Sequence, residues 1–302
     1  MTRLIFLLLL FKLSFSVLYP MSAYMEDIMD RKICLIAGFD KNNIIQDYVV
    51  FLVQELSKIS DVYYFADGNM SDTELSKIKA YTKFAQSLPH TGKDFGSWQY
   101  LIHYIGWKTL LTYDEMIICN DSIYGPMTNI EDIFDYMELR SYDFWGLTEN
   151  YNSNYYLDSY FMVFNQNVMR NCKFQEFWKN IIPETGKKTY ETVLTPFLTE
   201  LGFVGNSYIK NYKKEDQLAY PLHLLKHNKM PFIRVKSLKN PDENLKEPVF
   251  YIDSKIKQKT GYNTNMIKSH LSVNNDFKGF GFAYYFNNFT NAVKNKVENL
   301  FS

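Results

Sequence analysis

Cysteine is scarce in this chain of 302 residues, which contains three: Cys34, Cys119 and Cys172. No CxxC pair and no cysteine–histidine spacing typical of a zinc site occurs. An odd number of cysteines without a close pair does not form a disulfide framework. We therefore expect a protein of a reducing compartment, in which Cys34 and Cys119 act as small apolar residues of core strands.

The chain also lacks an excess of charge and several well-known site motifs. Its formal net charge is +0 and no basic block stands out, which argues against nucleic acid as a main partner. No GxxxxGK[ST] loop, no GxGxxG after the first expected strand and no GxSxG elbow is present, which argues against the corresponding nucleotide and hydrolase sites. His223 and His227 stand four apart, but no Glu lies between them and no third ligand is evident, so we interpret them as structural.

No apolar run reaches the length of about 20 residues that a membrane-spanning helix needs. The closest is at the start, where Arg3 precedes a mostly apolar run interrupted by Lys12. This N-terminal apolar segment, residues 1–30, is signal-like, but Lys12 and a weak cleavage site near Ala23 do not fit a secretory signal. A signal, a membrane-surface anchor and a start-site extension all stay open, and the cysteines favour the cytoplasm.

Strand-like and helix-like segments alternate along the chain. In the first half we expect strands at 32–38, 61–66, 84–88 and 116–119, helices at 43–59, 72–79 and 97–105, and a glycine-bearing loop at 90–96. In the second half we expect a strand or loop at 143–148, a strand at 159–165, helices at 130–139, 174–181, 189–201 and 218–227, and loops at 210–216 and 239–248. Pro196 should kink or split its helix. This alternation indicates βαβ units and a largely parallel sheet.

Acidic residues follow three of the expected strands. Asp67 ends the second strand, Asp94 lies in the loop after the third, and Asp121 ends the fourth between Asn120 and Ser122. Because the carboxyl ends of parallel strands share one edge, these side chains are expected to surround one ligand. Polar groups at a strand tip can hold a sugar hydroxyl, a ribose or a divalent cation that bridges phosphates. The alternative is that Asp121 and Ser122 only cap the following turn.

A nucleotide-sugar site would also need positive charge opposite the diphosphate. The candidate cations in the sequence are Lys93, Arg234 and Lys236, and Gly92 and Gly96 would permit close backbone approach.

Several segments between residues 31 and 238 carry a family resemblance in unbroken order: GKDFGSW (92–98), YDEMIICNDSIYGPM (113–127), DFWGLT (143–148), SYFMVFN (159–165), FQEFW (174–178), YETVLTPFLTELG (190–202) and the stretch 220–238. By these segments the chain resembles the rhamnan synthesis protein F family. The resemblance implies a glycosyltransferase of bacterial surface-polysaccharide synthesis, with rhamnose transfer as the type activity.

The layout is also similar to that of GT-A glycosyltransferases, and this implies the fold class: an α/β domain over 31–238 with a GT-A-like open, mostly parallel sheet flanked by helices. A C-terminal extension, 239–302, would carry a terminal helix. By position, Asp67 resembles the acid that contacts the nucleoside, and Asn120-Asp121-Ser122 a degenerate form of the motif that holds diphosphate and metal. Asp94 would be a second donor-side contact. Asp121 would then ligate Mg²⁺ or Mn²⁺, although a single carboxylate leaves the metal open.

An inverting transfer needs a general base beside the acceptor hydroxyl. By its order along the chain, Glu191 resembles the acid that acts as base in inverting GT-A enzymes, and Asp158 is the second candidate. The equally weighted alternative for Glu191 is a favourable acid in the first helical turn. The family usually has Asn at the position of His90, and His and Gln at those of Tyr156 and Asp158, so donor or acceptor choice could differ here.

The sequence therefore predicts a cytoplasmic glycosyltransferase that moves a sugar from a nucleotide-diphosphate donor to a growing surface-polysaccharide or lipid-linked glycan. Contact with the inner face of the membrane stays open, because an expected helix within 277–301 could lie on a membrane surface or pack on the body. The first alternative is a non-catalytic glycan- or nucleotide-binding subunit of a polysaccharide-assembly complex. The second is a secreted carbohydrate-binding protein.

Overall fold

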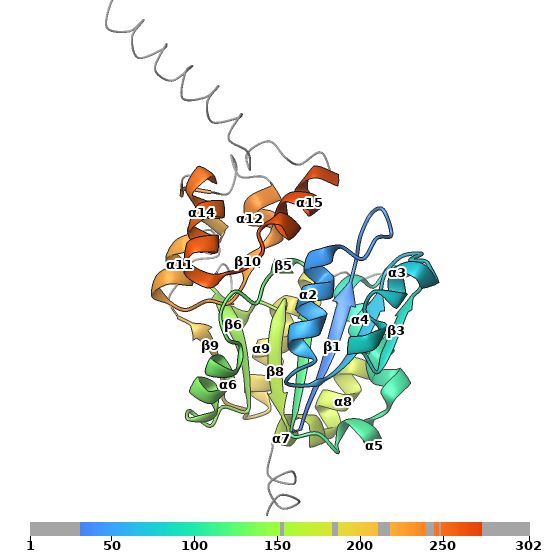
Figure 1. Cartoon of the computed structure of the whole chain (residues 1–302). Helices are drawn as coiled ribbons and strands as arrows, with labels where there is room; N and C mark the ends of the chain where they lie inside the picture. The colour runs from blue at the N-terminus through green and yellow to red at the C-terminus, as the bar shows by residue number, and fades with distance from the viewer. Residues whose placement is uncertain are drawn as a thin grey trace, which may run out of the picture. The chain divides into compact units, whose positions relative to one another are not determined.

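The computed structural model describes residues 31–151, 154–182, 187–210, 218–239, 245–247 and 249–273. The N-terminal apolar segment, the helix expected within 277–301 and nearly all of the loop expected at 210–216 lie outside these residues. From Lys32 onward the described residues belong to one compact unit built around an eight-stranded sheet with helices on both faces (Figure 1). The predicted domain boundary after residue 238 stays a prediction.

The first half of the sheet is parallel and follows the expected strands closely. β1 (Lys32–Gly38) pairs on one side with β2 (Asp61–Ala66) and on the other with β4 (Glu115–Asn120). β2 pairs in turn with β3 (Phe84–Ser87). All four strands therefore end at one edge, called the carboxyl edge below.

The second half contains two strands of opposite direction, β8 (Phe161–Asn165) and the short β7 (Tyr156–Leu157). β8 runs antiparallel between β4 and β6 (Phe144–Asn150), while β7 and β9 (Gly205–Ile209) pair with β6. The sheet order is β3-β2-β1-β4-β8-β6-β7, with β9 also on β6. Because β8 is reversed, its first residues lie at the carboxyl edge. The predicted open, mostly parallel sheet flanked by helices is thus confirmed.

The sheet is buried on both faces because alternate residues of β1 enter two different cores. Cys34 and Ile36 pack in one core, and Ile33 and Leu35 pack in the other. Burial on both faces explains why this strand appears in the sequence as a continuous apolar run.

The helices divide between the two faces. α2 (Asp47–Leu56) and α6 (Glu131–Glu138) cover one face, and α4 (Lys93–Ile105), α8 (Cys172–Lys179) and α9 (Lys187–Glu200) cover the other (Figure 1). The short helices are α3 (Asp72–Ser76), α5 (Trp107–Leu110), α7 (Gln166–Arg170) and the 3₁₀ turn Lys79–Tyr81. α9 continues past Pro196 as one helix rather than splitting there.

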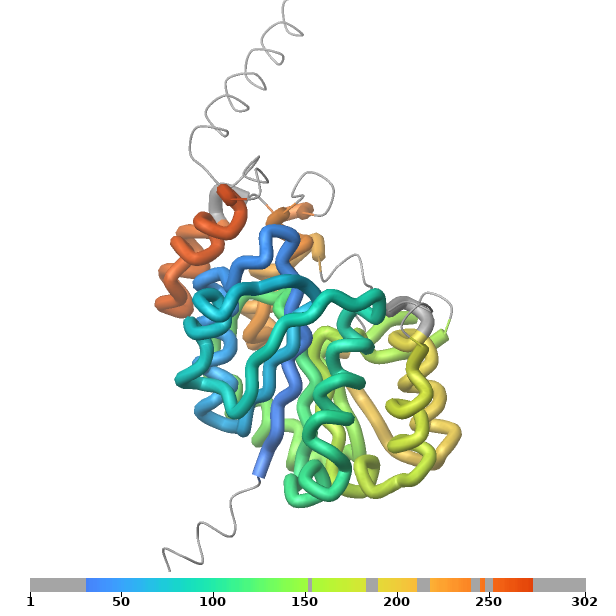
Figure 2. The backbone as a smooth tube through the Cα atoms, turned by 90° about the vertical axis from the view of Figure 1, so that its right-hand side faces the viewer, coloured from blue at the N-terminus to red at the C-terminus, as the bar shows by residue number. Residues whose placement is uncertain are grey.

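The C-terminal part is largely helical and packs at the carboxyl edge. It consists of α11 (Pro221–His227), β10 (Ile233–Arg234), α12 (Val235–Lys239), α14 (Val249–Thr260) and α15 (Asn265–Val273). β10 pairs antiparallel with β5 (Ile123–Tyr124), which follows β4, and α15 packs against α2 (Figure 2). Residues far along the chain therefore reach the strand ends. No helix in the described part of the chain is long and apolar enough to cross a bilayer.

Candidate active site

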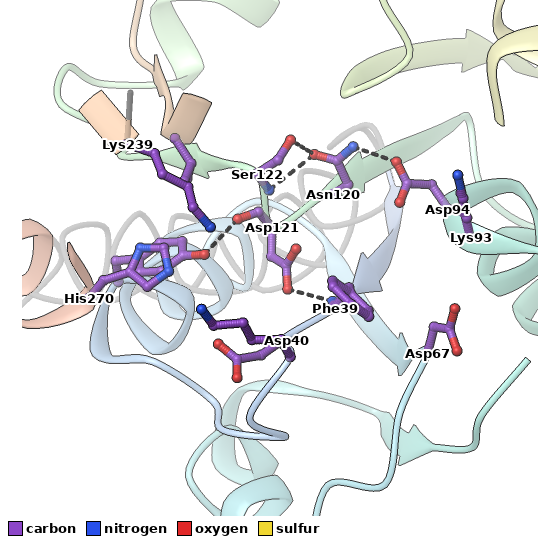
Figure 3. Close-up of a pocket in the computed structure, with 14 residues that line it drawn as sticks. Phe39, Asp40, Asp67, Lys93, Asp94, Asn120, Asp121, Ser122, Lys239 and His270 are labelled. Carbon is purple, nitrogen blue, oxygen red and sulfur yellow. Dashed lines mark hydrogen bonds between the residues drawn. The ribbon is translucent and has the colours of Figure 1, made fainter. Parts of the chain in front are cut away.

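A pocket of about 420 Å³ opens at the carboxyl edge between the ends of β1, β2 and β4, the start of α4, and the C-terminal helices (Figure 3). We call it the edge pocket. The structure brings together six residues singled out from the sequence, because all of them line this pocket: Asp67, Lys93, Asp94, Asn120, Asp121 and Ser122. Carboxylates that lie far apart in the sequence therefore share one cleft.

Asp121 is anchored at the centre of the edge pocket and is only 8% exposed. Its Oδ2 accepts a hydrogen bond of 2.8 Å from the backbone N–H of Phe39, and its carbonyl accepts one of 2.9 Å from the Tyr48 hydroxyl. Burial, reinforced by the nearby carboxylates of Asp94 and Asp40, raises the pKa of Asp121 to about 8 although the Phe39 hydrogen bond opposes the shift. A cation bound beside Asp121 would favour its ionised form.

The side chain of Asn120 forms hydrogen bonds with Asp94 and Ser122. Its Nδ2 donates to Asp94 Oδ2 at 2.7 Å, and its Oδ1 accepts from the Ser122 N–H at 3.1 Å and the Ser122 hydroxyl at 2.5 Å. Asp94 lies in the first turn of α4, so the loop expected at 90–96 is shorter than predicted. An acid at this place is favoured by the helix dipole.

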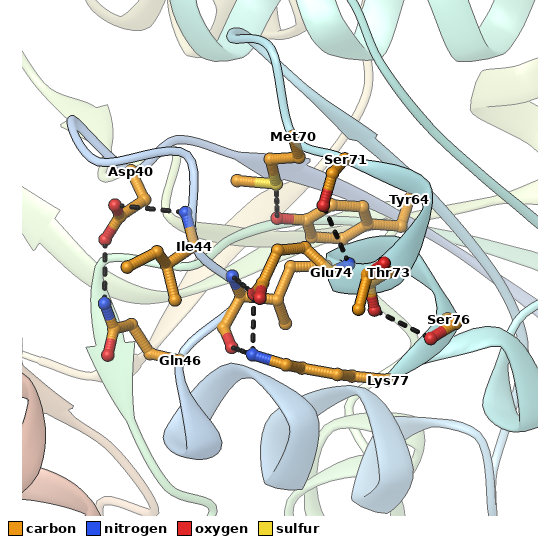
Figure 4. Close-up of polar contacts among 11 residues, drawn as sticks. Asp40, Ile44, Gln46, Tyr64, Met70, Ser71, Thr73, Glu74, Ser76 and Lys77 are labelled. Carbon is orange, nitrogen blue, oxygen red and sulfur yellow. Dashed lines mark hydrogen bonds and ion pairs between the residues drawn. The ribbon is translucent and has the colours of Figure 1, made fainter.

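The wall of the edge pocket after β1 is a loop built around Asp40 (Figure 4). Asp40 Oδ1 accepts from the backbone N–H groups of Asn42 at 2.7 Å and Ile44 at 3.3 Å, and Oδ2 accepts from Gln46 Nε2 at 3.1 Å. Both carboxylate oxygens of Asp40 are therefore occupied within the loop. Asp40 shapes the wall that carries Phe39.

The same loop is attached to α3. Glu74 accepts a hydrogen bond of 2.8 Å from the N–H of Ile45, and Lys77 donates one of 3.2 Å to the Ile45 carbonyl. Lys77 and Glu74 also form an ion pair of 2.6 Å (Figure 4). The loop after β1 is thus held by Asp40 from within and by Glu74 and Lys77 from α3.

A divalent cation fits this donor set only in part. Among the described residues, no group of three or more His, Cys, Asp or Glu side chains could hold a metal ion. Asp40 is committed to its loop, and one oxygen of Asp94 accepts from Asn120. Mg²⁺, however, is often held by one or two carboxylates together with substrate phosphates. The residues fit a cation shared by Asp121 and a diphosphate, not a cage made by the protein alone.

Two basic residues from the C-terminal helices, Lys239 of α12 and His270 of α15, also line the edge pocket. His270 Nδ1 lies 2.8 Å from the Tyr124 hydroxyl, and its ring centroid lies 4.7 Å from that of Tyr48. Neither residue is among the candidates from the sequence: Lys239 opens the stretch 239–248, for which the sequence predicts a loop, and His270 lies where the sequence pattern is weak. Phe39, Asp40 and Lys41 are not candidates either, although their position after the first parallel strand places them at the carboxyl edge.

Arg234, expected among the donor-side cations, is not among the residues that line the edge pocket. Its guanidinium carbon lies 4.1 Å from the centroid of the Tyr160 ring. The next residue, Val235, does line the pocket and donates its N–H to the Ser122 carbonyl at 2.9 Å. The β10 backbone thus directs Arg234 toward a neighbouring cluster.

That cluster contains Asp158, the second candidate base. Asp158 Oδ2 accepts from the Thr148 hydroxyl at 2.8 Å, and the hydroxyls of Thr148 and Tyr160 lie 2.9 Å apart. The Tyr160 carbonyl accepts from the Asn120 N–H at 3.1 Å, which joins this cluster to the edge pocket. Asp158 is only 1% exposed.

Glu191, the first candidate base, connects α9 to the chain just before β8. Its Oε1 accepts from the Ser159 N–H at 3.0 Å and from the Ser159 hydroxyl at 2.8 Å. α9 begins at Lys187 and has no acid in its first turn, so the first-turn explanation for Glu191 is wrong. Neither Glu191 nor Asp158 lines the edge pocket.

Comparison with known proteins places the chain in a family. The family model of rhamnan synthesis protein F matches residues 62–299. The chain belongs to this family. Family membership and the fold together support a glycosyltransferase. No curated protein matches the chain.

Solved structures give more distant likenesses. The glycosyltransferase GlyE of Streptococcus pneumoniae has 10% identity and a TM-score of 0.46, covering 82% of this chain and 64% of its own. A cytidylyltransferase of Leptospira borgpetersenii has 12% identity and a TM-score of 0.37, covering 78% and 100%. Core-mannan synthase A of Aspergillus fumigatus, solved in a Mn/GDP form, has 10% identity and a TM-score of 0.33, covering 61% and 73%. Likenesses this distant carry no weight for the chemistry of the site.

Proposed function

We propose that this member of the rhamnan synthesis protein F family transfers a sugar from a nucleotide-diphosphate donor bound in the edge pocket. The observation that carries the proposal is the meeting of Asp67, Asp94 and Asp121 with Lys93 and Lys239 in one pocket of about 420 Å³. Pockets of roughly 300–1,000 Å³ with a few convergent polar groups are typical of small-molecule sites. Mixed charge of this kind suits a ligand with hydroxyls at one end and phosphates at the other.

The nucleoside would lie toward the ends of β1 and β2. Asp67 has one oxygen occupied by the N–H of His90 at 2.9 Å, so its carboxylate is held in a fixed orientation toward a ribose. Phe39 lines the same pocket and is 61% exposed. An exposed ring at a nucleotide pocket offers a stacking face for a base. Phe39 and Asp67 would therefore hold the nucleoside from two sides.

The diphosphate would lie near Asp121, Lys93 and Lys239. Lys239 takes the role for which Arg234 was the sequence-based candidate, because Lys239 lines the pocket and Arg234 does not. A Mg²⁺ or Mn²⁺ ion held between Asp121 and the phosphates would supply further charge neutralisation for the departing diphosphate. The two lysines bind and orient the diphosphate and stabilise the negative charge that grows on it.

The acceptor would approach from the side of β6 and β8. Glu191 and Asp158 stay the candidate bases, and the link between Tyr160 and Asn120 puts their region next to the edge pocket. We further propose rhamnose as the sugar, and a surface-polysaccharide or lipid-linked glycan as the acceptor. The reaction would take place in the cytoplasm, with peripheral contact to the inner face of the membrane.

The decisive experiment separates binding from turnover. The purified full chain is screened by thermal shift against nucleoside diphosphates and their sugars, and the best ligand is tested for transfer with and without Mn²⁺. We expect stabilisation by one nucleotide class and transfer that Asp121→Ala abolishes while its fold is retained. Near wild-type turnover in Asp121→Ala would remove Asp121 from the mechanism.

A second function is favoured by a specific observation. Among the described residues no three-ligand metal cluster exists, and neither candidate base lines the edge pocket. Both facts would suit a non-catalytic nucleotide- or glycan-binding subunit of a polysaccharide-assembly complex. Binding of a nucleotide sugar without transfer or hydrolysis, with or without Mn²⁺, would support this alternative.

A further inference from the structure

A second hollow, of about 350 Å³, lies between α11 and α14 and shares no lining residue with the edge pocket. Among the described residues, its polar lining consists of three lysines, two histidines and one acid: Lys226, Lys255, Lys259, His223, His227 and Glu247. We call it the cationic hollow. Both helices contribute positive side chains, so the charge is concentrated at their contact.

The single acid does not balance these charges. The two oxygens of Glu247 accept the backbone N–H groups of Leu222 at 2.6 Å and His223 at 2.8 Å. Its carboxylate is therefore directed to the start of α11. Among the described residues, Lys226 and Lys259 form no ion pair, and Lys255 donates a hydrogen bond of 3.2 Å to the neutral side chain of Gln258.

A neighbouring lysine on α14 shows the contrast. Lys257 lies 3.7 Å from Asp253, and Asp253 also accepts from Lys268 at 2.8 Å. Asp253 does not line the cationic hollow. The acid of this helix is thus paired outside the hollow. The lysines that line the hollow form no ion pair with a described acid.

The side chains that line the cationic hollow disfavour the binding of a metal ion. The rings of His223 and His227 lie 4.6 Å apart, as a helical metal pair could. Desolvation and the positive charges of Lys226, His223 and Lys259 lower the pKa of His227. Surrounding lysines repel a cation by the same Coulomb interaction that attracts an anion.

We propose that the cationic hollow binds a phosphate-bearing anion. Lys226, Lys255 and Lys259 supply the charge, and the ring N–H groups of His223 and His227 donate hydrogen bonds to phosphate oxygens. Free diphosphate and the headgroup of an anionic lipid share this chemistry. The hollow would add a phosphate-binding site outside the edge pocket. This proposal does not depend on whether the edge pocket transfers a sugar.

The test uses the full chain and a matched set of variants. Binding of inorganic pyrophosphate is measured by calorimetry, and co-sedimentation is measured with vesicles of phosphatidylglycerol and phosphatidylcholine and with vesicles of phosphatidylcholine alone. The test variant is Lys226→Gln with Lys259→Gln, and the control is Lys257→Gln on the same helix. Lys239→Gln reports any pyrophosphate bound in the edge pocket, and thermal unfolding checks that each variant is folded.

We expect the double variant to bind at least one of the two probes about tenfold more weakly, while Lys257→Gln binds as the wild type does. Weaker binding of pyrophosphate by the double variant identifies a free phosphate compound as the ligand. Weaker co-sedimentation of the double variant with the anionic vesicles alone identifies a lipid headgroup as the ligand. Equal binding of both probes by the wild type and the folded double variant, or equal loss in Lys257→Gln, overturns the proposal.

Discussion

The backbone N–H of Phe39 donates a hydrogen bond of 2.8 Å to the carboxylate of Asp121, across 82 positions of the chain. This contact joins the ends of two neighbouring parallel strands, β1 and β4. It orients a buried acid toward a pocket whose wall carries an exposed aromatic ring. One hydrogen bond only partly offsets the cost of burying a carboxylate, so the stability of the protein should depend on the proton of Asp121.

Asp121→Asn should change the pH dependence of unfolding. Burial raises the pKa of Asp121 from 3.8 to about 8, so the folded state binds the proton more tightly than the unfolded state. Stability from this group is full below pH of about 4 and is lost as the pH rises toward about 8. Between pH of about 5 and about 8.5, we expect the metal-free wild type to lose on the order of 4 kcal/mol relative to Asp121→Asn. Urea unfolding in the presence of EDTA measures this difference, and parallel profiles for the two proteins would contradict it.

Asp40→Ala should loosen the wall of the edge pocket. The substitution removes the acceptors for Asn42, Ile44 and Gln46 at once. We expect a loss of about 1 kcal/mol in the free energy of unfolding, because the three donors are exposed or only partly buried and can bind water instead, together with weaker nucleotide binding. Lys77→Gln is the comparison, because it weakens the attachment to α3 but leaves the loop's own hydrogen bonds intact. A wild-type unfolding midpoint in Asp40→Ala would show that the loop does not need this carboxylate.

Lys239→Gln should weaken the binding of a nucleoside diphosphate without changing the fold. Lys239 lines the edge pocket, whereas Lys236, one helical turn earlier, does not. A hydrogen bond to a charged group contributes about 1.5–3 kcal/mol, so we expect a dissociation constant roughly ten- to hundredfold higher in Lys239→Gln. Lys236→Gln should bind as the wild type does. Calorimetric titration of both variants decides the matter, and equal affinities would remove Lys239 from the site.

The strands and the acids at their ends could be predicted because they follow from local patterns. β1 and β2 occupy their expected ranges, Lys32–Gly38 and Asp61–Ala66, since burial on both faces requires continuous apolar residues. Parallel strands then place Asp67 and Asp121 at one edge without further information.

Two further residues of the site, Lys239 and His270, depend on tertiary packing that no local pattern encodes. Lys239 and His270 reach the pocket only because the C-terminal helices pack at the carboxyl edge. Arg234 has the right charge, but the pairing of β10 with β5 places its guanidinium over Tyr160. The pattern of charges along the sequence could not distinguish Arg234 from Lys239.

The choice between the two candidate bases can be made with isosteric amides. Glu191→Gln keeps an oxygen that accepts from both donors of Ser159, and Asp158→Asn keeps one for Thr148, so both folds should survive. Glu191 is partly exposed, whereas Asp158 is 1% exposed and cannot meet an acceptor hydroxyl without rearrangement.

We therefore expect Glu191→Gln to lower kcat by about 10²–10⁴-fold, the usual contribution of a general base, with little change in the KM for the donor. Ser159→Ala leaves the carboxylate of Glu191 in place but removes one of its donors, so it should cost only a few-fold. The same kcat loss in Ser159→Ala as in Glu191→Gln would show that Glu191 acts by holding the start of β8. A loss confined to Asp158→Asn would assign the base to Asp158 instead.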